Sequence, residues 1–99
     1  MAVKLKADPT HATRVESILR DAGAEHVRAR NYGATVIAES GPTDEPVRHF
    51  RLRRDTVHLW CLDMAGRGGR WERTPFRANL DELVLQVTEQ FPWVLTPIA

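Results

Sequence analysis

Residues 46–74, PVRHFRLRRDTVHLWCLDMAGRGGRWERT, decide the fold class of this 99-residue chain. The stretch alternates between apolar and polar residues, and turn-forming residues interrupt it twice. It predicts three short strands, joined by a tight turn at residues 55–56 and by a glycine-rich loop at residues 66–69. Because strands with short connections pair side by side in opposite directions, we expect an antiparallel sheet.

The first of these strands has two different faces. Its apolar side chains, Phe50 and Leu52, should point to one side of the sheet. Its polar side chains should point to the other, and they are His49, Arg51 and Arg53. This pattern is typical of an antiparallel sheet that packs one face on a core and leaves the other face open.

Two amphipathic helices are expected, one before and one after most of the strands. Asp8 and Pro9 have the residue types of a helix N-cap and of a first helical position. The second helix should begin after Asn79 and end before Pro92. Apolar residues recur at helical spacing in both, and we expect them to be buried: Val15, Ile18, Leu19, Leu83, Val84, Val87 and Phe91.

Further strands are predicted at residues 2–7, 26–30 and 34–39, and residues 74–76 should be extended. Strands and helices in this order indicate an α+β fold, a two-layer sandwich. We expect a mostly antiparallel sheet of five to six strands with two helices on one face. Residues 1–99 are expected to form a single domain, since 99 residues suit one core.

Composition excludes several classes of protein. A hydrophobic content of 42% is ordinary for a globular chain, and a net charge of +1 gives no global attraction to nucleic acid or membranes. A single cysteine, Cys61, argues against a disulfide framework. No apolar run approaches the roughly 20 residues of a membrane span, and the first residues lack a signal-peptide core. The chain has far fewer lysines than arginines, a composition typical of proteins encoded by GC-rich genomes. We therefore expect a cytoplasmic bacterial protein with no membrane association.

Charge is unevenly distributed along the chain. Residues 26–77 carry ten arginines and six acids, an excess of +4, whereas residues 78–99 carry three acids and no basic residue. One interpretation is a basic face that binds RNA or DNA, with Tyr32, Trp60 or Trp71 stacking on bases. The other is a solvated face whose arginines pair with acids of neighbouring loops: Asp44, Glu45, Asp55 and Glu72.

The candidate binding residues fall in two groups. Those on the sheet face are Arg28, Arg30, His49, Arg51 and Arg53. The others, Arg67 and Arg70, flank glycines whose backbone N–H groups can cradle an anion, although the loop matches no phosphate-binding fingerprint.

No catalytic or metal-binding constellation stands out. The four histidines, at positions 11, 26, 49 and 58, lack a spacing that would bring three ligands together. His49 and His58 are the pair most able to meet, across neighbouring strands. No serine or cysteine lies in a nucleophile motif. We expect neither a cofactor nor a bound metal.

These observations favour a small non-catalytic binding or accessory protein whose arginine-rich sheet face engages a protein partner. Weak nucleic-acid binding by the same face is the alternative. A second alternative is an enzyme whose anion-binding site is completed across a dimer, with Arg51 and His49 holding the substrate. The apolar segment 93–98 and the edge at residues 3–5 make a homodimer a further expectation.

Overall fold

The computed structural model describes residues 5–95, which form one five-stranded antiparallel sheet and two α-helices. The helices are α1 (Pro9–Asp21) and α2 (Leu80–Gln90), and two short 3-10 turns are η1 (Arg67–Gly69) and η2 (Pro92–Leu95). The strands are β1 (Arg28–Tyr32), β2 (Thr35–Ser40), β3 (Val47–Arg54), β4 (Trp60–Ala65) and β5 (Trp71–Ala78). The expected α+β class and the antiparallel pairing are confirmed.

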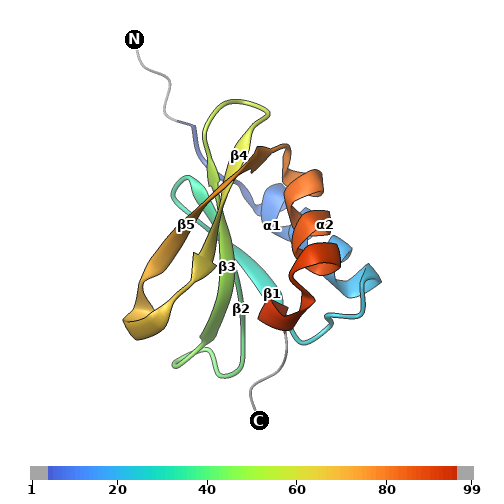
Figure 1. Ribbon diagram of the computed structural model, residues 1–99, viewed down its shortest axis with the longest axis vertical. Helices are drawn as coiled ribbons and strands as arrows, with labels where there is room; N and C mark the ends of the chain where they lie inside the picture. The colour runs from blue at the N-terminus through green and yellow to red at the C-terminus, as the bar shows by residue number, and fades with distance from the viewer. Residues whose placement is uncertain (1–4, 96–99) are drawn as a thin grey trace.

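The molecule has two layers. The strands lie in the sheet in chain order, and every neighbouring pair is antiparallel. Helix α1 packs on β1 and β2, helix α2 packs on β4 and β5, and the helices contact each other. Figure 1 shows both helices on the same side of the sheet, as the sequence predicts. Among the described elements, none covers the opposite side.

The core lies between the helices and the covered face of the sheet. Phe50 and Leu52 from β3 are fully buried there, and so are Val15 and Leu19 of α1. The expected stripe of α2 is buried as well: Leu83, Val84 and Val87. Phe91 differs from the prediction because it is only half-buried. It caps the end of α2, and its ring lies 5.6 Å from the rings of Phe76 and Trp93, measured between centroids.

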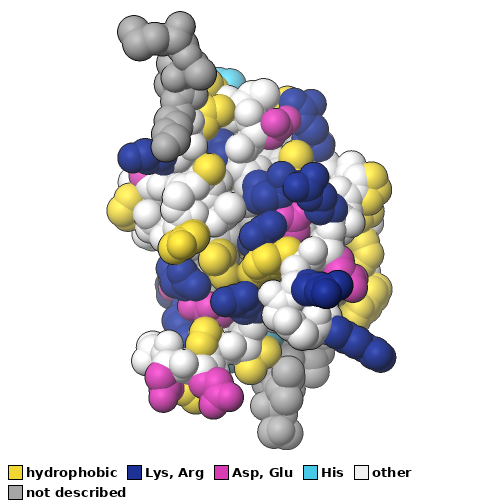
Figure 2. All heavy atoms as spheres, turned by 90° about the vertical axis from the view of Figure 1, so that its left-hand side faces the viewer, with side chains coloured by type: hydrophobic (Ala, Val, Ile, Leu, Met, Phe, Trp, Pro, Cys, Tyr) yellow, Lys and Arg dark blue, Asp and Glu magenta, His cyan; other side chains and the backbone are white. Residues whose placement is uncertain are grey.

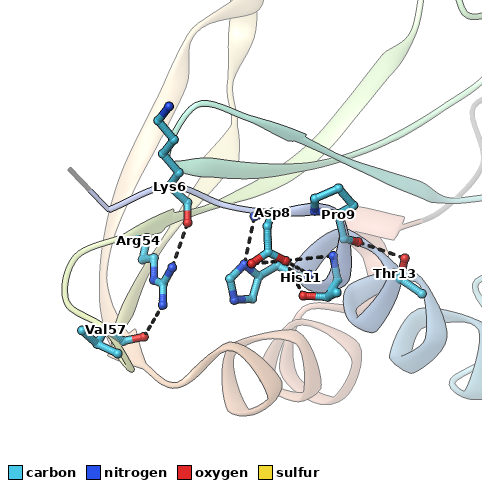
Figure 3. A network of polar contacts seen from close by, with 8 residues as sticks. Lys6, Asp8, Pro9, His11, Thr13, Arg54 and Val57 are labelled. Atoms are coloured by element: carbon cyan, nitrogen blue, oxygen red, sulfur yellow. Dashed lines mark hydrogen bonds and ion pairs between the residues drawn. The ribbon is translucent and has the colours of Figure 1, made fainter. Parts of the chain in front are cut away.

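Helix α1 begins where the sequence predicts. The Asp8 side chain accepts hydrogen bonds from the backbone N–H groups of Thr10 and His11, and Pro9 occupies the first turn. The His11 ring returns the contact, since its Nδ1 accepts the Asp8 N–H at 3.1 Å (Figure 3). The hydrogen bond from the Thr10 hydroxyl is the main reason that the pKa of Asp8 is lowered. A carboxylate in this position compensates helix N–H groups that lack partners.

The connection from β3 to β4 spans residues 55–59 and is longer than the predicted tight turn. Arg54, the last residue of β3, holds it in place. Its Nη1 donates to the Lys6 carbonyl and its Nη2 to the Val57 carbonyl, both at 2.8 Å (Figure 3). This guanidinium therefore ties the start of the described chain to the loop at that end of the sheet.

The two ends of the chain also differ from expectation. Of the strand predicted at residues 2–7, residues 2–4 lie outside the described range, and residues 5–8 form no strand. Ala7 only donates its N–H to the Gly33 carbonyl at 2.9 Å. At the other end, the segment expected to be strand-like begins with the turn η2, and residues 96–98 lie outside the described range. The dimer edges proposed at these segments stay predictions.

We predict that Leu83→Ala lowers the free energy of unfolding by about 2–5 kcal/mol, because it leaves a cavity in a close-packed core. Leu85→Ala is the matched control on the same helix, since Leu85 is 46% exposed and should cost less than about 1 kcal/mol. Urea unfolding of the two variants measures the difference. Equal losses would mean that α2 presents a different face to the sheet.

Candidate binding site on the open sheet face

The uncovered face of the sheet is rich in arginine. Figure 2 shows it with many lysine and arginine side chains, a few carboxylates between them and apolar side chains near the middle. Strand pairing and alternation assign the following residues to it: Arg28, Arg30, Tyr32, Thr35, Ile37, Glu39, Arg48, Arg51, Arg53, Cys61, Asp63, Trp71, Arg73 and Arg77. All four arginines predicted for this face therefore lie on it: Arg28, Arg30, Arg51 and Arg53.

A β-bulge between β2 and β3 corrects the prediction for His49. Ala38 lies opposite Phe50, but the next residue, Glu39, lies opposite Arg48. His49 is the extra residue and has no partner across the ladder. An extra residue changes the alternation that follows it, so Arg48 takes the place on the open face that simple alternation gives to His49.

His49 is instead buried beneath the C-terminal turn η2, with 3% of its surface exposed. Its Nδ1 lies 2.7 Å from the Val94 carbonyl, which can only accept, so Nδ1 carries the proton. The Ser40 hydroxyl then donates to Nε2 at 2.7 Å. Burial is the main cause that lowers the pKa of His49, and the ring of His26, 6.1 Å away, adds to this. His49 is thus a packing residue of the covered side and is not part of the open face.

Asp63 is the most unusual residue of the open face, because it is a carboxylate with no exposed surface at all. It lies in the middle of β4, opposite Arg51. Arg51 Nε donates to its Oδ2 at 2.7 Å, and Arg53 donates through Nε at 2.6 Å and through Nη2 at 3.2 Å. The hydrogen bond to Asp63 is the main cause that raises the pKa of Arg53.

Glu39 forms a second buried pair on the same face. It is 4% exposed, and its Oε1 accepts from Arg30 Nε at 2.8 Å. The acids expected to neutralise the arginines lie on loops, but the two that do so here come from the strands themselves. Of the described arginines on this face, Arg77 is the one that pairs with an acid expected on a loop, and it donates to Asp55 at 2.6 Å. The face is therefore a layer of ion pairs in which arginines outnumber carboxylates.

A hollow of about 570 Å³ lies in this layer. Its walls include the side chains of Arg30, Tyr32, Ile37, Arg48, Arg51 and Trp71. Two guanidinium groups lie over the Trp71 ring, that of Arg51 at 4.9 Å and that of Arg48 at 5.8 Å from the ring centroid. A third, that of Arg30, lies 5.9 Å from the Tyr32 ring. Cation–π contacts of this kind attract a guanidinium group to the face of an aromatic ring and so help to hold it in place.

Of the predicted binding residues, only Arg30 and Arg51 line the hollow, and five lie outside it. His49 and Arg53 are described above, and the other three are Arg28, Arg67 and Arg70. Arg28 donates to the carbonyls of Gly41 and Pro42, at 2.6 and 3.4 Å, and so fixes the loop between β2 and β3. Arg67 and Arg70 lie exposed at the turn between β4 and β5.

The backbone conformation of the turn explains why glycines lie between Arg67 and Arg70. Gly68 and Gly69 adopt φ angles of 67° and 75°, a region that side chains disfavour. The turn therefore requires these glycines, whether or not the loop meets an anion. The sequence does not single out Ile37 and Arg48 of the hollow's walls, nor the acids Glu39 and Asp63 that pair with two of its arginines. A charged residue at position 48, where alternation predicts an inward side chain, is the one signal in the sequence that could have revealed the bulge.

Among residues 5–95, no three His, Cys, Asp or Glu side chains gather to form a metal site. His58 lies in the connection 55–59, beyond the far end of β3 from His49, so these two histidines are not neighbours. No helix in the described part of the chain is both long and apolar enough to cross a membrane.

Comparison with known proteins gives no family for this chain. No protein-family model matches it, and neither the curated proteins nor the solved structures yield a significant match. The function therefore has to be argued from the chemistry of the open face.

We predict that Asp63→Asn lowers the free energy of unfolding by about 3 kcal/mol, the lower end of the range for breaking a buried ion pair. Two guanidinium groups would lose their shared carboxylate, but both are partly exposed and can regain water. Asp55→Asn, which breaks the exposed pair with Arg77, should cost less than about 1 kcal/mol. Equal costs, measured by urea unfolding, would contradict a central role for Asp63.

We predict that protonation of His49 destabilises the fold in mild acid. The folded protein holds its pKa below the ordinary 6.5, so the unfolded chain takes up a proton first as the pH falls. The free energy of unfolding should then decrease below about pH 7, by at most about 1.4 kcal/mol per pH unit. The decrease should stop below the lowered pKa. His49→Asn should flatten this dependence, whereas His58→Asn, at an exposed position, should not. Identical pH profiles for the wild type and His49→Asn would contradict the assignment.

Proposed function

We propose that this protein is a small non-catalytic binding module that engages a protein partner through its open sheet face. The observation that carries the proposal is the hollow around Trp71, where two arginines lie over an indole ring beside apolar side chains. Tryptophan, tyrosine and arginine are the residues that contribute most to the energy of protein interfaces. Here Trp71, Tyr32, Arg48 and Arg51 converge on one rigid sheet.

The buried carboxylates favour a protein partner over a nucleic acid. Asp63 offsets much of the charge of Arg51 and Arg53, and Glu39 offsets that of Arg30. The positive charge left near the hollow is small, whereas nucleic-acid affinity rises with the number of phosphates that are neutralised. A face of modest net charge with aromatic anchors matches the centre of a protein interface better.

The remaining expectations belong to the same proposal. The arginine-rich composition favours a bacterial origin, and an accessory role in the cytoplasm is part of the same proposal. The partner can be a second copy of the chain, in which case the protein is a homodimer. The enzyme alternative loses one of its two substrate-holding residues, because His49 lies on the other side of the sheet from Arg51.

We predict that Trp71→Ala abolishes capture of the partner, while Trp93→Ala does not. Both remove a tryptophan, but Trp93 lies beyond α2 and is 66% exposed. The wild type and both variants would be cross-linked in extracts of the source cells. The captured protein would then be purified, and its binding to all three measured at physiological salt. Loss of binding by more than about 10-fold in Trp71→Ala alone supports the proposal.

Two other outcomes would contradict it. Salt-sensitive binding of mixed-sequence oligonucleotides, lost in Trp71→Ala, would favour the nucleic-acid alternative. A purified partner that binds Trp71→Ala as well as the wild type would place the interface elsewhere. Sizing the wild type and Trp71→Ala in solution tests whether the partner is a second copy.

A further inference from the structure

Three guanidinium groups around the hollow have N–H donors that no acceptor of the described chain uses. Arg30 and Arg51 use only their Nε atoms, on Glu39 and Asp63. The Arg48 side chain makes no hydrogen bond or ion pair with any other residue between 5 and 95. The terminal nitrogens of all three arginines therefore have no protein acceptor within that range. Arg30 and Arg48 are exposed residues, and the terminal nitrogens of Arg51 are not among the buried unpartnered atoms. These nitrogens are donors that face the hollow or its rim.

These guanidinium groups are also held in position. The buried carboxylates of Glu39 and Asp63 each hold the Nε of one guanidinium, of Arg30 and Arg51 respectively, and leave its terminal nitrogens without an acceptor among the described residues. The Trp71 ring supports Arg48 and Arg51 from one side. Fixing flexible side chains before a ligand arrives lowers the entropy that binding must offset. A ligand would thus meet a preformed set of donors.

We propose that the hollow recognises a side-chain carboxylate of an acidic partner segment, an Asp or Glu that is followed or preceded by an apolar residue. This inference rests on the proposed function and names the chemistry of the partner. Arginine forks match carboxylates in a bidentate geometry, with charge-assisted hydrogen bonds. Arg48 is the main carboxylate ligand, because no acid of the described chain neutralises it.

The apolar part of the motif follows from the floor of the hollow. Ile37 of β2 lies between Arg30 and Arg51 in the strand register and is 7% exposed, whereas Tyr32 of β1 is 69% exposed. An aliphatic or aromatic side chain next to the carboxylate would bury apolar surface mainly against the Tyr32 ring, over the little of Ile37 that is exposed. A purely electrostatic contact would not require an apolar residue next to the acidic one. The apolar residue therefore distinguishes this motif from a generic acidic tail.

The test uses a displayed library of random dodecamer peptides, selected on the wild-type protein. Selected peptides are then measured against Arg48→Gln, Arg48→Lys and Arg67→Gln. Arg67→Gln is the matched control, because it removes the same charge from the exposed turn η1, outside the hollow. Thermal unfolding of each variant checks that the fold is intact. Arg48→Gln should pass this check, since the Arg48 side chain makes no hydrogen bond or ion pair with the described residues.

We expect the selected peptides to share an acidic residue beside an apolar one. Replacing that Glu by Gln, or Arg48 by Gln, should weaken binding about 10-fold to 100-fold, as for loss of a hydrogen bond between charged groups. Arg48→Lys should recover only part of the affinity, because lysine lacks the fork. Arg67→Gln should change binding less than about two-fold, the size expected for a distant surface charge.

The failures of the two proposals can be told apart. Peptides that need Trp71 but carry no acidic residue, or that bind Arg48→Gln as well as the wild type, would overturn carboxylate recognition and leave the binding face intact. A library that yields no peptide would also overturn it. Tighter binding when phosphoserine replaces the Glu would assign the hollow to phosphate instead. Peptides that bind equally to wild type and Trp71→Ala would contradict the proposed function itself.

Discussion

The β-bulge between β2 and β3 is the constraint on which both faces of this sheet depend. One extra residue, His49, shifts the alternation of β3 relative to β2. The shift places the His49 ring inside, where it accepts from Ser40 and donates to the Val94 carbonyl. It places Arg48 outside, over Trp71. The same local irregularity thus fastens the C-terminal turn to the core and supplies the hollow with an arginine that no acid of the described chain pairs with.

The open face meets a second physical requirement. A sheet covered by helices on one side only has a second face that must be stable in contact with water. Here Asp63 and Glu39 lie almost or entirely out of solvent contact between the arginines. Both oxygens of Asp63 accept from guanidinium groups, which limits the cost of its burial. Glu39 accepts from Arg30 through Oε1 alone, and its Oε2 is buried without a partner among the described residues. The arginines in turn are oriented by these acids, so the feature that stabilises the face also prepares it for binding.

Much of the fold could be predicted from sequence, and the reasons are local. Asp8 and Asn79 are good N-caps, and the apolar stripes of α1 and α2 have helical spacing. The open face could be predicted only in part. The alternating pattern assumes a regular strand, and it does not reveal that a bulge adds one residue. Alternation therefore predicts the wrong side of the sheet for position 49. The pairing of Asp63 with Arg51 and Arg53 depends on register across β3 and β4, which the sequence of either strand alone does not contain. The arrangement of the chain ends likewise depends on tertiary contacts, such as those of Arg54.

Proton NMR tests the central claim, the orientation of residues 48 and 49, most directly. The account predicts that the side-chain methylene protons of Arg48 show nuclear Overhauser contacts to the Trp71 indole and shifts caused by its ring current. It also predicts contacts from the His49 ring to Val94 and His26. Contacts from the His49 ring to Trp71 or Arg51, with Arg48 near Val94, would show a regular ladder without the bulge and would contradict the account.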